Sequence, residues 1–118
     1  EHPLIVCGDI NIAPDDGDVW DPFECEGKLL FHPLEREALQ HVLDWGLVDA
    51  FRLKNPFSSA FSWWDYRGSG FKRNQGFRID HHFISTALKA RCSGVRIWRE
   101  TRGWERPSDH APVVVEID

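Results

Sequence analysis

Three short polar clusters in this sequence could carry out chemistry. Asp9 and Asn11 directly follow an apolar run, and Asp80 lies inside a second, strand-like run. Asp109 and His110 precede a third such run at the end of the chain. Taken singly, each cluster also suits a polar turn or a structural ion pair. Together they supply carboxylates, an amide and an imidazole, the groups that hydrolysis of a phosphodiester needs.

Each of these groups has a definite use in such a reaction. One carboxylate can orient or deprotonate a water, and a divalent metal on carboxylate oxygens offsets the phosphate charge. An asparagine and a protonated histidine can donate hydrogen bonds to the phosphate. A buried carboxylate is costly unless it is paired, and it can hold a histidine in one tautomer. We therefore expect Asp80 to be the partner of His110.

Other polar residues are less suited to catalysis. Ser108 lacks the G-x-S-x-G elbow of a serine nucleophile, so we reject a triad with His110. His81 and His82 point to opposite faces of a strand, so we expect packing or supporting roles for them and no metal ligation. The three cysteines have no C-x-x-C spacing, which argues against a disulfide framework and a zinc site.

The apolar pattern predicts a strand-rich chain with at least one helix. Strands are expected at 4–7, 61–66, 78–85, 95–99 and 112–117, with a weak extended segment at 47–53. Segments 8–33 and 67–76 are loop-like, and 86–90 suits a helical turn. The run 34–45 predicts a helix with one apolar stripe and two leucines beside it: Leu34, Ala38, Val42 and Trp45, then Leu39 and Leu43. The continuous apolar run 4–7 predicts a strand covered on both faces.

Composition places the chain among soluble globular proteins. Hydrophobic residues make up 42% of the chain and charged residues 28%. Its length of 118 residues is enough for one domain with one core. Without a membrane-length apolar run or a signal-peptide pattern, the expected location is cytoplasmic and no membrane partner is expected. The chain contains no methionine, so we expect it to be a piece of a longer protein.

The net charge of −5 hides a local polarity. Segment 15–26 carries six acidic residues and no basic one, whereas segment 67–78 carries four basic residues and no acidic one. Local fields of this kind can steer an anionic ligand. A solvated loop is the more common explanation of either run.

Four motifs in this order resemble the C-terminal half of the bacterial exodeoxyribonuclease III family: LIVCGDINIAP, SWWDYR, NQGFRIDHHFIS and PSDHAPVVVEI. This family belongs to the endonuclease/exonuclease/phosphatase superfamily. The resemblance implies an α/β (α+β) fold, half of a four-layer α/β sandwich with a mixed, largely antiparallel sheet flanked by helices. Residues 1–118 would then be the C-terminal half of the domain. The absent N-terminal half would carry the glutamate that is the main metal ligand.

The resemblance also implies roles for the polar residues. Asp9 would orient or activate the attacking water, and Asn11 and His110 would contact the scissile phosphate. Asp80 would support His110, and Asp109 would lie at the metal site. The implied metal is Mg²⁺, with Mn²⁺ as an alternative, held near Asp9, Asn11, Asp109 and His110.

Two further groups are implied to contact DNA. Trp63, Phe77 and Ile79 match positions that line the pocket for a flipped-out abasic sugar. Arg73 and Arg78 match the DNA-facing region. The implied substrate is double-stranded DNA with an abasic site or a 3′ end.

The predicted function is a magnesium-dependent DNA-repair nuclease, an abasic-site endonuclease and 3′–5′ exonuclease that acts as a monomer when complete. We expect residues 1–118 alone to be poorly active. One alternative is another phosphodiesterase of the superfamily, acting on lipid head groups or inositol phosphates; the aromatic and basic residues of 61–78 argue against it. The other is a non-catalytic nucleic-acid-binding module, which would not need the whole polar set.

Overall fold

The computed structural model describes residues 2–118 as a mixed α/β structure. Its strands are β1 (Ile5–Asp9), β2 (Leu47–Asp49), β3 (Trp63–Trp64), β4 (Gly76–Phe77), β5 (Asp80–Ser85), β6 (Cys92–Ile97) and β7 (Val113–Ile117). Its α-helices are α1 (Pro22–Cys25), α2 (Pro33–Leu43) and α3 (Ala50–Lys54). Short 3₁₀ helices cover Asp16–Asp18, Arg67–Ser69, Thr86–Arg91 and Arg99–Gly103. Helices α1 and α3 lie in segments for which the sequence predicted a loop and an extended stretch.

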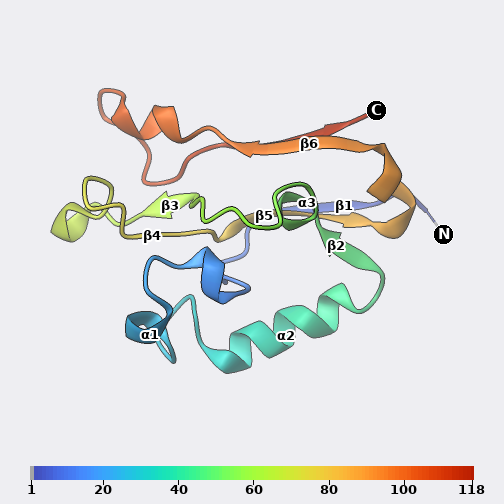
Figure 1. Ribbon diagram of the computed structural model, residues 1–118, viewed down its shortest axis with the longest axis horizontal. Helices are drawn as coiled ribbons and strands as arrows, with labels where there is room; N and C mark the ends of the chain where they lie inside the picture. Colours follow the sequence, from blue (N-terminus) through green and yellow to red (C-terminus); the bar gives the residue numbers. More distant parts are fainter. Residues whose placement is uncertain (1) are drawn as a thin grey trace.

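The strands form a central sheet and two smaller ones. The central sheet has the order β1-β5-β2, and the pairs β3-β4 and β6-β7 stand beside it. Within residues 2–118 every strand pair is antiparallel. In Figure 1, β6 lies above the row formed by β3, β5 and β1, and α2 lies below that row. The strands and flanking helices confirm the predicted α/β class.

Strand β5 is the middle of this arrangement, and its alternation follows the expected pattern. Ile79, just before the strand, is 2% exposed, and His81 and Phe83 are each 1% exposed, so they share a buried face. Asp80 and His82 on the other face are half-buried. Register pairs the first residue of β5, Asp80, with the last residue of β1, Asp9. This pairing places two carboxylates at one end of the sheet.

Helix α2 turns a different side to the sheet than the apolar stripe suggested. Leu39 is buried and Leu43 half-buried, whereas Leu34 is 70% and Trp45 88% exposed. The two apolar stripes are adjacent on the helix, and periodicity alone does not say which of them meets a neighbour. The tertiary packing selects the stripe of the two leucines.

Strand β1 is only partly covered on its faces within residues 2–118. Leu4, Ile5 and Val6 are 51%, 40% and 38% exposed. The expectation of a doubly covered strand is therefore not met by this part of the chain. In the same residues, no helix is both long enough and apolar enough to cross a bilayer.

Candidate active site

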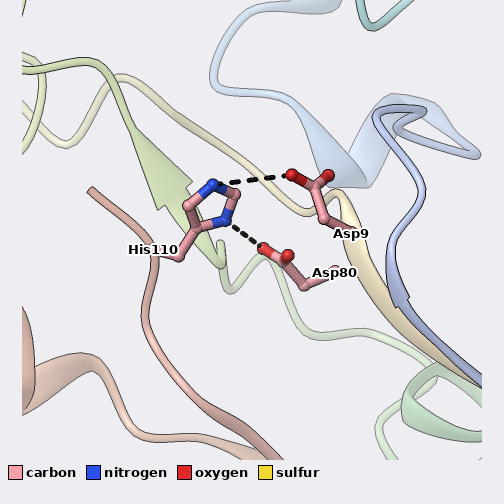
Figure 2. A group of neighbouring side chains, drawn as sticks. All are labelled: Asp9, Asp80 and His110. Atoms are coloured by element: carbon pink, nitrogen blue, oxygen red, sulfur yellow. Dashed lines mark hydrogen bonds and ion pairs between the residues drawn. The ribbon is translucent and has the colours of Figure 1, made fainter. Parts of the chain in front are cut away.

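Asp80 and His110 form the pair expected from the sequence. The Nδ1 of His110 donates a hydrogen bond to Oδ2 of Asp80 over 2.8 Å, and its Nε2 lies 3.6 Å from Oδ2 of Asp9 (Figure 2). The His110 side chain is 31% exposed and that of Asp80 only 17%. One imidazole nitrogen is thus held by a largely covered carboxylate, while the other faces the open side of the site. This geometry confirms the Asp80–His110 prediction.

A buried serine ties both members of the pair to the same point. The Ser62 hydroxyl accepts hydrogen bonds from the backbone N–H groups of Ile79 and Asp80, over 3.0 and 3.1 Å. The Ser62 carbonyl accepts from the backbone N–H of Ala111, next to His110, over 2.7 Å. Ser62 is 0% exposed. Sequence reasoning missed it, because a serine before two tryptophans resembles any polar position in a strand.

Asn11 is placed by an unusual backbone conformation. Its φ is 59°, in the left-handed region that asparagine tolerates better than most residues. Its backbone N–H donates to Oδ1 of Asp9 over 3.0 Å. This is the turn that seemed to compete with a catalytic role for Asp9, yet it engages only one carboxylate oxygen. The other oxygen is the one that faces His110.

Side chains that could bind a divalent cation gather at this end of the sheet. Asp9, Asp80 and His110 each offer a ligand atom, and these atoms lie within 4.8 Å of one another. Asp109 is adjacent: its Oδ1 is 3.9 Å from Nε2 of His110, and its Oδ2 accepts a hydrogen bond from Nε1 of Trp63 over 3.0 Å. A carboxylate-rich set fits Mg²⁺ or Mn²⁺. Which of the predicted ligands, Asn11 included, would bind the ion stays a prediction.

An apolar cleft adjoins this polar cluster. It has a volume of about 650 Å³, and Trp63, Phe77 and Ile79 line it together with Asn11 and His110. The Trp63 and Phe77 rings lie 5.7 Å apart between centroids. The predicted pocket residues are therefore brought together beside the site. Sequence reasoning missed the rest of the lining. Much of it comes from the loop expected at 8–33, namely Trp20, Cys25, Lys28, Leu29 and Leu30, and the remainder comes from residues 65–75.

The prediction that Arg78 faces DNA is wrong. Its side chain is 1% exposed, and its Nε donates to Oδ1 of Asp18 over 2.7 Å. Its Nη2 donates to Oδ2 of Asp49 over 2.6 Å. Two carboxylates from distant segments hold the guanidinium inside the fold, where phosphates cannot reach it. Arg73 is exposed, and its contact with DNA stays a prediction.

Burial and charge act in opposite directions on the Arg78–Asp49 pair. Burial works to lower the pKa of Arg78, but Asp49 and Asp18 outweigh it and raise that pKa. Burial works to raise the pKa of Asp49, but hydrogen bonds and charge from Arg78 lower it below 3.8. Both groups are therefore charged in the folded state.

We expect Arg78→Leu to lower the free energy of unfolding by about 3–5 kcal/mol, because two carboxylates lose their buried partner. The stabilisation from Asp49 is complete above its ordinary pKa of 3.8 and is lost as pH falls through its lower folded-state pKa. Urea unfolding of the complete protein between pH 2 and 7 measures both effects. Arg73→Leu is the control, and equal stability of the two variants would contradict the buried role.

The sequence comparison decides the family. Residues 1–110 match the Endonuclease/Exonuclease/phosphatase family. The chain belongs to this family. Among curated members, exodeoxyribonuclease III of Haemophilus influenzae is 43% identical over 98% of the chain and 46% of its own length. The exodeoxyribonuclease of Bacillus subtilis is 38% identical over the full chain and 46% of its own length.

Two solved structures superpose closely on this chain. The 3′ phosphatase NExo from Neisseria, bound to product DNA hairpin, superposes with a TM-score of 0.96 at 45% identity. It is matched over 98% of this chain and 45% of its own chain. An AP endonuclease from Archaeoglobus fulgidus superposes with a TM-score of 0.92 at 33% identity. The match covers 98% of this chain and 46% of that chain. The chain thus spans about half the length of these family members.

Proposed function

We propose that this chain supplies the C-terminal half of a divalent-metal-dependent DNA-repair nuclease, an abasic-site endonuclease and 3′–5′ exonuclease on duplex DNA. The observation that carries the proposal is the Asp80–His110 pair, which faces Asp9, together with the apolar cleft that His110 lines. The names of its relatives, exodeoxyribonucleases and AP endonucleases, support the same chemistry.

The residues divide the work of hydrolysis among them. Asp9 orients a water and takes its proton, since its side chain is 40% exposed and only one of its oxygens accepts a hydrogen bond from Asn11. Protonated His110, stabilised by Asp80, and the amide of Asn11 donate hydrogen bonds to the phosphate as its charge grows. A bound Mg²⁺ would supply charge neutralisation at the phosphate oxygens. Asp9 and Asp109 would help to hold it.

The rest of the protein completes this site in our proposal. The uncovered residues of β1 give the N-terminal half an apolar surface on which to pack. Residues 1–118 alone then lack part of the metal site and lose most activity. In the complete enzyme, the N-terminal half covers this surface, completes the metal site and restores activity. We propose that the complete enzyme acts as a monomer.

The deciding experiment incubates the complete protein with duplex DNA that carries one abasic site, with Mg²⁺ and then with EDTA. We expect cleavage on the 5′ side of the site, abolished by EDTA, and slow removal of nucleotides from a 3′ end. Faster hydrolysis of a phosphoinositide would identify another phosphodiesterase. DNA binding without cleavage under any metal would identify a binding module. Either result would refute the proposal.

We expect Phe77→Ala to relax discrimination, raising cleavage at undamaged nucleotides relative to abasic sites. A base-free sugar fits an apolar cleft, whereas a normal nucleotide brings a base that is too large and must leave its stack. Enlarging the cleft reduces this difference in fit between a base-free sugar and a normal nucleotide. The measurement is the ratio of kcat/KM for the two duplexes, with unchanged Mg²⁺ dependence.

Phe31→Ala is the matched control for this variant. Phe31 is fully buried in the same apolar cluster as Ile79, with Phe77 packed against it, but it does not line the cleft. It should lower stability and leave the ratio unchanged. If Phe77→Ala loses both activities in parallel, as expected for a purely structural residue, the pocket assignment fails.

A further inference from the structure

The imidazole of His81 bridges the loop after Asn11 and the buried ion cluster that Arg78 forms with Asp18 and Asp49. Its Nε2 lies 2.8 Å from the carbonyl oxygen of Ile12. Its Nδ1 lies 3.1 Å from Nη1 of Arg78. The ring stacks on Phe83 with centroids 5.2 Å apart, and it is 1% exposed. His81 therefore has a fixed position and a polar contact at each nitrogen.

The partners determine the protonation of this ring. A guanidinium can only donate, so Nδ1 of His81 must accept from Arg78. Nε2 then carries the proton and donates to the Ile12 carbonyl. Burial and the charge of Arg78 both lower the pKa of His81, in agreement with a neutral ring. The hydrogen bond to Ile12 thus follows from the position of Arg78.

Arg78 is in turn held rigidly, and it holds the same loop further along. Asp18 and Asp49 fix its guanidinium from two sides. The backbone N–H of Arg78 also donates to the Asp18 carbonyl over 2.8 Å. The loop that leaves β1 is consequently tied to β5 by the contact of Ile12 with His81, and to the residues just before β5 by the contacts of Asp18 with Arg78.

The loop needs such ties, because Asn11 is held at φ 59°. Asparagine tolerates that region better than most residues, but the conformation still costs free energy and contacts on both sides stabilise it. On one side, the Ile10 N–H donates to the Ile79 carbonyl over 3.0 Å. On the other side, His81 holds Ile12. The residues that hold Asn11 are thus the immediate neighbours of Asp80.

We propose that His81 is a positioning residue, which fixes the Asn11 loop relative to the Asp80–His110 pair through its hydrogen bond to Ile12. The inference rests on the proposed nuclease function. It assigns His81 no contact with substrate or metal. Loss of its bond would let Asn11 shift away from the phosphate while leaving the DNA-binding surface intact.

The test uses His81→Phe and His81→Gln in the complete enzyme, on a duplex with one abasic site. Phenylalanine keeps the stacking on Phe83 and removes the donor to Ile12. We expect kcat to fall about 10- to 100-fold with little change in KM, the range seen when supporting residues are lost. Glutamine places an amide donor near the position of Nε2 and should recover most of kcat.

The control for a general loss of stability is Leu88→Ala, in an apolar cluster away from the loop. It should lower the melting temperature without changing kcat at a temperature where the protein is folded. If His81→Phe also lowers only the melting temperature, or if glutamine fails to rescue kcat, the positioning role is refuted.

Amide hydrogen exchange separates this inference from the proposed function. In His81→Phe, protection should fall at Ile10 and Ala13, whose N–H groups bond to Ile79 and Leu30, while β6 and β7 keep theirs. This readout needs no activity. A wild-type protein that cleaves no DNA would refute the nuclease function, and the exchange result would then decide the positioning role of His81. A uniform loss of protection would refute the positioning role alone.

Discussion

Replacement of Asp9 by asparagine is expected to lower kcat by about 10²- to 10⁴-fold, the usual contribution of a general base. The substitution is nearly isosteric, and the new amide oxygen can still accept the hydrogen bond from the Asn11 N–H. The loop should therefore keep its shape. What disappears is the negative charge that faces His110 and takes the proton of the water.

Single-turnover cleavage of an abasic duplex measures this loss, and fluorescence anisotropy without Mg²⁺ measures DNA affinity. Asp16→Asn is the control, because it removes one exposed negative charge from the following loop. We expect near-normal turnover for the control and near-normal affinity for both variants. Turnover of Asp9→Asn within a few-fold of wild type would exclude Asp9 as the base.

Asp80→Asn is expected to slow the chemical step by one to two orders of magnitude and to change DNA binding little. The hydrogen bond from Nδ1 of His110 is charge-assisted, and such bonds contribute about 1.5–3 kcal/mol. Each 1.36 kcal/mol corresponds to about a tenfold change in rate. The amide can still accept this bond but no longer stabilises imidazolium.

The Nδ1–H proton resonance of His110 reports the bond directly. In wild type it should be shifted downfield and protected from exchange with water, and in Asp80→Asn it should move upfield or broaden. Asp44→Asn, on the exposed end of α2, is the control. An unchanged His110 signal would mean that Asp80 stabilises something else. An equal loss of affinity and turnover would indicate a structural role.

The Asp80–His110 pair was predictable from the sequence because its signals are local. Asp80 interrupts an apolar run, and a carboxylate in a strand needs a partner. Asp9 and Asn11 follow the run that forms β1, and pairing of β1 with β5 places Asp9 opposite Asp80. Asp109 and His110 precede the run that forms β7, which pairs with β6 outside the central sheet. The alternation that buries Ile79, His81 and Phe83 follows from the two-residue period of a strand.

The tertiary structure alone decided which distant residues meet. Arg78 resembled a surface arginine in a basic segment, but its partners are 60 and 29 residues away, and no local pattern encodes such separations. Ser62 and the cleft wall from 20–30 are likewise placed by contacts between separate segments. The stripe that α2 buries depends on which neighbour it meets. Periodicity determines the sides that an element has, whereas packing between elements determines what each side contacts.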